Sequence, residues 1–195
     1  MEAFRQLDAV AVPLGLANVD TDQIVPALYL QKPRSADFGR FLFCDVRRDA
    51  QGAARADFPL NDPAYADARI LVAGRNFGCG SSREHAVWAL HDGGFRAVIA
   101  PSFGDIFFSN SLKNGLLPVR LEQACVDALL DALRAHPGAH VRIDLLALKV
   151  AGPGGIESSF SVDAFARHCL IEGIDELDYT LSQHARIEAF ERLGD

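Results

Sequence analysis

Two patterns of hydrophobic and polar positions alternate along residues 69–136. Short apolar runs, typical of buried strands, are separated by longer stretches in which apolar residues recur at helical spacing. The apolar runs cover residues 70–73, 97–100 and 117–121, and the helical stretches cover about 82–92, 103–114 and a third that ends at His136. Strands separated by helices in this way form βαβ units. The pattern therefore predicts an α/β fold whose parallel sheet core is flanked by helices.

Turn and capping residues support these boundaries. Gly93, Gly115 and Pro137 stand where the three helices should end, because glycine and proline interrupt helical geometry. Ser102 and Ser161 stand where helices should begin, because a serine hydroxyl can accept a hydrogen bond from a free N–H of the first turn.

Outside this region the pattern is weaker. Residues 10–16 and 141–145 read as strands, and the glycine- and proline-containing stretch 151–159 reads as a hairpin turn. Residues 31–67 combine glycines and prolines with many charges and predict an irregular loop. Loops of this length in a compact domain are usually functional or mobile.

Composition narrows the function classes. A chain of 195 residues with 49% hydrophobic content can bury one core, so a single domain over residues 1–195 is predicted. Its net charge of −7 disfavours a nucleic-acid or anionic-membrane surface. Apolar stretches fall short of the roughly 18 to 20 residues of a membrane span, and the N-terminus lacks a basic leader, so we expect a cytoplasmic protein. The four cysteines form no C-x-x-C pair, and no metal site is predicted on this chain.

The sequence G-R-N-F-G-C-G-S-S-R-E-H-A, residues 74–86, follows directly on a predicted strand and precedes a predicted helix. Arg83 replaces the third glycine of G-x-G-x-x-G, and the patterns of a Walker A loop and of a nucleophile elbow also fail. The end of a strand next to a helix N-terminus still favours an anion such as a carboxylate. Ser81, Ser82 and Arg83 could surround one, and Ser81 could act as a base.

A structural alternative accounts for the same residues. Ser81-x-x-Glu84 matches a capping box, in which the serine hydroxyl serves only to cap the helix. The sequence leaves both interpretations open.

Three motifs together carry a resemblance to a known family. In chain order they are N-V-D-T-D-Q-I-V-P at 18–26, the glycine-rich motif at 74–86, and S-F-G-D-I-F-F-S-N-S-L-K-N-G-L-L-P at 102–118. With them, the chain from about residue 4 onward resembles the small subunits of the 3-isopropylmalate dehydratases, which are related to the swivelling C-terminal domain of aconitase. The resemblance implies a swivelling β/β/α domain that closes over a larger partner subunit.

The resemblance also implies a reaction. It is the interconversion of 2- and 3-isopropylmalate, small dicarboxylic acids of leucine biosynthesis, by a hydro-lyase that removes and re-adds water. The partner, in a heterodimer or heterotetramer, is implied to hold a [4Fe–4S] cluster whose iron acts on the departing hydroxyl.

Roles for individual residues follow from the same resemblance. Ser81 matches the base, and Ser82 and Arg83 match substrate-carboxylate contacts. Thr21 and Asp22 match a T-D motif that faces the active site. We expect residues 27–60 to form a substrate-specificity loop that is mobile without the partner.

Two residues of that loop bear on the substrate. Leu30 would suit an isopropyl group, whereas Arg34 would suit a third carboxylate. The loop therefore leaves open a sister hydro-lyase acting on citraconate and 2-methylmalate, or on a homoaconitate-like acid. A non-catalytic carboxylate-binding module would use the same helix terminus without a metal partner.

Overall fold

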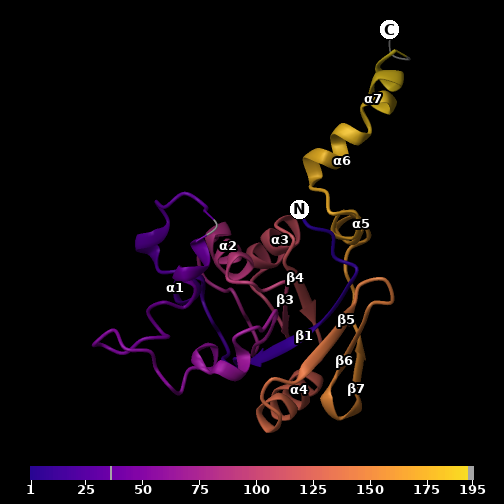
Figure 1. Cartoon of the computed structure of the whole chain (residues 1–195). Coiled ribbons are helices and arrows are strands. Elements are labelled where there is room, and N and C mark those ends of the chain that lie inside the picture. Colours follow the sequence, from indigo (N-terminus) through magenta and orange to yellow (C-terminus); the bar gives the residue numbers. More distant parts are fainter. Residues whose placement is uncertain (36, 193–195) are drawn as a thin grey trace.

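A mixed sheet of seven strands lies at the centre of the molecule (Figure 1). The structure is a computed structural model that describes residues 1–35 and 37–192. The strands are β1 Gln6–Pro13, β2 Ile70–Val72, β3 Ala97–Ala100, β4 Leu117–Arg120, β5 His140–Asp144, β6 Lys149–Gly152 and β7 Ile156–Ser159. Their order is β4-β3-β2-β1-β5-β6-β7. Strands β1 to β4 are parallel, and β5, β6 and β7 continue the sheet in antiparallel pairing. The predicted α/β fold with a parallel sheet core is confirmed.

Strand β1 joins the two halves of this sheet. Residues 11–13 pair in parallel with β2, whereas residues 6–10 pair antiparallel with β5. The predicted strand, 10–16, started four residues too late and ended three too late. The first half alternates exposed polar residues, Gln6 and Asp8, with buried apolar ones, as one-sided antiparallel strands do. The sequence pattern of that half was therefore less apolar than that of the fully buried strands.

Helices cover both faces of the parallel half. Helices α2 (Glu84–Asp92) and α3 (Asp105–Lys113) lie on one face, and α4 (Gln123–Ala135) lies on the other (Figure 1). The side chain of Leu71 packs in the core of the α2 and α3 face, while its neighbours Ile70 and Val72 pack in the core of the α4 face. A strand buried on both sides explains why residues 70–73 form a continuous apolar run.

The predicted helix ends are confirmed, but the two predicted capping serines are wrong. Helix α3 begins after Gly104, and the Ser102 hydroxyl instead accepts a hydrogen bond from the main-chain N–H of Asn76 over 2.8 Å. Helix α5 (Ala164–Glu172) is capped by Asp163, whose carboxylate accepts hydrogen bonds from two N–H groups of its first turn. Ser161 lies two residues further upstream.

The segment between β1 and β2 has no regular strand among its described residues. It contains the short helix α1 (Thr21–Ile24) and 3₁₀ turns at Ala27–Tyr29, Phe38–Phe41, Pro59–Asn61 and Pro63–Tyr65. Phe38, Leu42 and Phe43 are buried and join the core on the α2 and α3 face. The predicted irregular segment is therefore fixed to the domain near its middle.

The C-terminal helices α6 (Glu176–Ser182) and α7 (His184–Glu191) extend away from the sheet (Figure 1). Within the described residues, none of the helices combines the length and the apolar character needed to cross a membrane.

Candidate functional site

The glycine-rich loop lies at the carboxyl end of β2, where the crevices of open α/β sheets usually bind ligands. It is joined to the segment around α1 by main-chain hydrogen bonds. The N–H of Gly78 donates to the carbonyl of Val19 over 2.7 Å, and the N–H of Thr21 donates to the carbonyl of Cys79 over 3.0 Å. Two of the three motifs, which residues 27–73 separate in the sequence, therefore lie side by side.

Two glycines shape the loop. Gly78 and Gly80 have φ angles of +71° and +88°, in a region that other residues rarely adopt. A Cβ atom on Gly78 would also collide with the ring of Phe107 on α3. The loop can therefore lie directly against α3, and its backbone stays open to a ligand.

Neither serine of the motif caps helix α2. The helix begins at Glu84, and Arg83 occupies the N-cap position without a side-chain hydrogen bond to the described first turn. The capping interpretation of Ser81 and Ser82 is therefore wrong. A capping box does occur nearby, on α1, where Asp20 and Gln23 satisfy each other's main-chain N–H groups. Ser81 and Ser82 are both exposed, and their hydroxyls are accessible to a ligand.

A cavity of about 220 Å³ opens in front of these serines. The residues around it are Gly78, Gly80, Ser81, Ser82, Gly104, Asp105, Ile106 and Phe107. The starts of α2 and α3 both lie at or beside this cavity, so two helix N-termini direct their positive dipole ends toward it. A small carboxylate is the kind of ligand that this environment favours.

Thr21 and Asp22 reach the site in different ways. The Thr21 side chain is 2% exposed, and its hydroxyl donates a hydrogen bond to the main-chain carbonyl of Ser81 over 2.8 Å. Asp22 forms an ion pair with the guanidinium of Arg83. Thr21 thus holds the Ser81 main chain, and Asp22 orients Arg83 at the start of α2.

The structure separates Arg34 from this group. Its guanidinium donates to both carboxylate oxygens of Asp92, over 3.1 and 2.8 Å. Asp92 is the last of the nine residues of α2, about 13 Å along the axis from its start. Leu30 is half-buried and ends the 3₁₀ turn Ala27–Tyr29. The predicted contacts of Leu30 and Arg34 with a substrate stay predictions.

No spacing rule predicts the polar network beside Arg34, although its members Glu84 and Asn114 lie in two of the quoted motifs. Asn114, which ends α3, connects Arg34 with Trp88 and Glu84 on α2. Burial of the Asp92 carboxylate raises its pKa, but the hydrogen bonds from Arg34 and His91 outweigh burial, and the pKa of Asp92 is lowered overall. The carboxylate is therefore held in its charged form.

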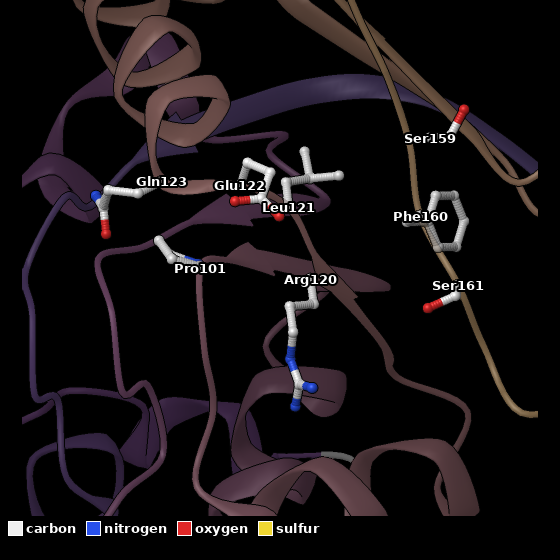
Figure 2. A pocket seen from close by; sticks show the side chains of 8 residues that line it. All are labelled: Pro101, Arg120, Leu121, Glu122, Gln123, Ser159, Phe160 and Ser161. Atoms are coloured by element: carbon white, nitrogen blue, oxygen red, sulfur yellow. The ribbon is translucent and has the colours of Figure 1, made fainter.

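A larger hollow, of about 550 Å³, lies at the ends of β3, β4 and β7. Figure 2 shows Ser159, Phe160 and Ser161 along one segment of this hollow and Arg120 pointing away from Glu122. The Arg120 guanidinium lies over the ring of Phe108, 5.0 Å from its centre. None of the residues around this hollow belongs to the three sequence motifs, whereas the cavity at Ser81 is formed by two of them.

The described residues of the chain do not form a metal-binding site. Cys44, Cys79, Cys125 and Cys169 are free thiols on separate segments. Among the described residues, His, Cys, Asp and Glu side chains nowhere form a group of three or more that could hold a metal ion. These residues do not fit an iron–sulfur cluster.

Comparisons with known proteins agree on one relationship. Residues 1–124 match the model of the aconitase C-terminal domain. The chain is 50% identical over 191 residues to the 3-isopropylmalate dehydratase small subunits of Dinoroseobacter shibae and Paramagnetospirillum magneticum, with 98% of this chain and 95% of each relative covered. The crystal structure of 3-isopropylmalate dehydratase from Methanocaldococcus jannaschii superposes with a TM-score of 0.67 at 26% identity, covering 95% of this chain and 99% of that one.

Proposed function

This chain belongs to the aconitase C-terminal domain family, among the 3-isopropylmalate dehydratase small subunits, and we propose that it forms half of the active site of such a hydro-lyase. The partner is the large subunit, in a heterodimer or heterotetramer in the cytoplasm. The reaction is the interconversion of 2- and 3-isopropylmalate in leucine biosynthesis. One observation carries the proposal: two exposed serines that leave the helix uncapped stand beside a guanidinium, at a cavity faced by two helix N-termini.

Ser81 is the base in this proposal. Its oxygen takes the proton from the carbon next to a substrate carboxylate, the electrons of that C–H bond form a double bond, and hydroxide leaves the adjacent carbon. Water then adds to the same double bond in the opposite sense to give the isomer. A serine hydroxyl is a very weak acid, so its deprotonated form needs stabilisation. The dipole of α2 and the charge of Arg83 supply that stabilisation.

Ser82 and Arg83 hold the substrate carboxylate. A guanidinium can donate two parallel hydrogen bonds to a carboxylate, and its ion pair with Asp22 limits its rotation before substrate binds. A [4Fe–4S] cluster on the large subunit would supply the Lewis acid for the departing hydroxyl. The proposal assigns this cluster to the partner; the described residues of this chain contain no group of His, Cys, Asp and Glu side chains that could hold a metal ion.

Residues 27–60 form the substrate-specificity loop in this proposal, with Leu30 contacting the alkyl end of the substrate. In this proposal the mobility without the partner belongs to exposed parts of the loop such as residues 48–57, because Phe38, Leu42 and Phe43 are buried and Arg34 pairs with Asp92. Arg34 is the alternative contact, for a substrate with a third carboxylate.

The proposal is tested with a complex of this chain and its large subunit, produced together under anaerobic conditions. Initial rates are compared on isopropylmalate, on citraconate with 2-methylmalate, and on a homoaconitate-like tricarboxylate. The proposal predicts the highest kcat/KM for isopropylmalate. A preference for citraconate would indicate the sister hydro-lyase, and a preference for the tricarboxylate would contradict the role in leucine biosynthesis.

A non-catalytic carboxylate-binding module is the alternative of another class. It predicts a chain that stays alone on purification and binds small dicarboxylates tightly by calorimetry. A brown, iron-containing complex with a second, larger chain contradicts it.

A further inference from the structure

The side chain of Arg34 attaches its loop to the C-terminal end of α2. Its Nε and Nη2 atoms donate to the two oxygens of Asp92, over 3.1 and 2.8 Å, which is the bidentate geometry of strong guanidinium–carboxylate pairs. The guanidinium also lies 5.7 Å from the ring centre of Trp88 on the same helix. The Asp92 side chain is only 11% exposed, so solvent screens this pair less than a surface pair.

Asp92 needs this partner. A carboxylate in the last turn of a helix faces the negative end of the helix dipole, which is unfavourable. The guanidinium of Arg34 neutralises that charge.

The loop returns to the same place on α2. Gly39 lies directly against the main chain of Asp92 and Gly93, and a Cβ atom at Gly39 would come within 2.5 Å of the Asp92 carbonyl. Phe38 packs edge-on against Trp88, with ring centres 6.0 Å apart. Residues 34 and 38–39 therefore form two attachments of one loop to one end of a helix.

Asn114 extends this contact toward the start of α2. Its Oδ1 accepts hydrogen bonds from Trp88 Nε1 over 3.1 Å and from Arg34 Nη1 over 3.5 Å. Its Nδ2 donates to Glu84 Oε1 over 2.8 Å and to the carbonyl of Asn110 over 2.9 Å. Tryptophan and arginine can only donate, and a carboxylate and a carbonyl can only accept, so an asparagine amide satisfies all four partners. Glu84 directly follows Arg83.

We propose that Arg34 and Asn114 are positioning residues: Arg34 anchors the loop to Asp92, and Asn114 couples that anchor to Glu84, beside the carboxylate-binding Arg83. The inference rests on the proposed function for its consequence, but the anchor itself stands on contacts within this chain. Loosening it lowers the fraction of molecules whose loop is in the binding position. The apparent affinity for substrate falls in proportion to that fraction, while the bound complex reacts at an unchanged rate.

The first test measures KM and kcat of the two-subunit complex on isopropylmalate. We expect Asp92→Asn to raise KM about fivefold or more with kcat within about twofold, because a neutral amide cannot hold the guanidinium bidentately. Arg34→Gln serves as a second variant and should likewise raise KM while leaving kcat nearly unchanged. Asp37→Asn is the matched control, because it removes the exposed 2.6 Å ion pair with Arg40 in the same loop and should leave KM unchanged.

Asn114→Asp tests the coupling to Glu84. It keeps the shape of the side chain but places two carboxylates in contact, so KM should rise by a similar factor. Adding Glu84→Gln restores a donor to that contact. The double variant should return KM to within about twofold of Glu84→Gln alone, a rescue that general destabilisation would not produce.

A readout without catalysis uses trypsin on the folded chain. The bond after Arg34 is a tryptic site that the anchor protects, and Asp92→Asn should increase its cleavage about threefold or more, followed by mass spectrometry. Asp37→Asn should not change this cleavage. Equal cleavage of Asp92→Asn and wild type, or a fall in kcat with KM unchanged, would overturn the inference. A wild-type complex inactive on isopropylmalate would instead contradict the proposed function, and the trypsin experiment would still decide whether the anchor exists.

Discussion

The Thr21 hydroxyl donates a hydrogen bond to the main-chain carbonyl of Ser81, over 2.8 Å. The main-chain N–H of Thr21 donates to Cys79, so Thr21 binds the loop on both sides of Gly80. Since Thr21 is almost fully buried, both bonds are shielded from water. One threonine therefore fixes the backbone that carries the proposed base.

Replacing Thr21 should separate this positioning role from simple packing. Thr21→Val keeps the shape of the side chain but leaves the Ser81 carbonyl without its donor, at a cost of about 1–3 kcal/mol in the free energy of unfolding. We expect kcat of the complex to fall about tenfold or more, because the Ser81 oxygen loses its alignment. Thr21→Ser keeps the hydroxyl and should retain most of the rate. Urea denaturation and steady-state kinetics measure the two effects, and equal rates for the two variants would argue against the role.

Gly78 should tolerate no side chain. Gly78→Ala adds a Cβ at positive φ that also collides with Phe107, and we expect a loss of about 3 kcal/mol or more in the free energy of unfolding. Gly94 is the matched control, because it has a φ of +97° and open space around its Cβ position. Gly94→Ala should lower the free energy of unfolding only by the cost of a positive φ angle in a residue with a Cβ, about 1–2 kcal/mol. Thermal unfolding of both variants measures the difference, which would vanish if the loop could move away from α3.

The sequence predicted the parts of the fold in which a strong pattern coincides with burial. Residues 70–73 and 97–100 are apolar because both faces of their strands are covered, and this pattern is visible without a structure. The N-terminal half of β1 was missed because its pairing with β5 leaves Gln6 and Asp8 exposed.

The candidate site was predictable only in part. Glycines, serines and an arginine before a helix indicated an anion site, but the sequence Ser81-x-x-Glu84 in the same motif also matched a capping box. Whether Ser81 caps α2 depends on where the helix begins, and that is decided by the packing of the loop on α3 and by Thr21. The pairing of Arg34 with Asp92 joins residues 58 positions apart, and such contacts leave no periodic signal in one sequence.

The contribution of Asp92 to stability should depend on pH in one direction. Its pKa is lowered in the folded protein, so the ion pair with Arg34 stabilises the fold above the ordinary aspartate pKa and loses this effect as pH falls through the lower folded value. We expect Asp92→Asn to cost about 1–3 kcal/mol at pH 7. The cost should persist at pH 5, above the unperturbed aspartate pKa of about 3.9, and should shrink progressively as the pH falls below that value. Urea denaturation of wild type and variant at three pH values measures it, and a cost already absent at pH 5 would contradict the lowered pKa.

Ser81→Ala in the reconstituted two-subunit complex tests the central claim most directly. The variant removes the proposed base without disturbing the helix, because Ser81 does not cap α2. Ser82→Ala is the comparison, and it should mainly raise KM because Ser82 holds the carboxylate. With assembly confirmed by gel filtration, we predict that Ser81→Ala lowers kcat on isopropylmalate by about 10²- to 10⁴-fold. A kcat within about threefold of wild type, in a correctly assembled complex, would show that Ser81 is not the base.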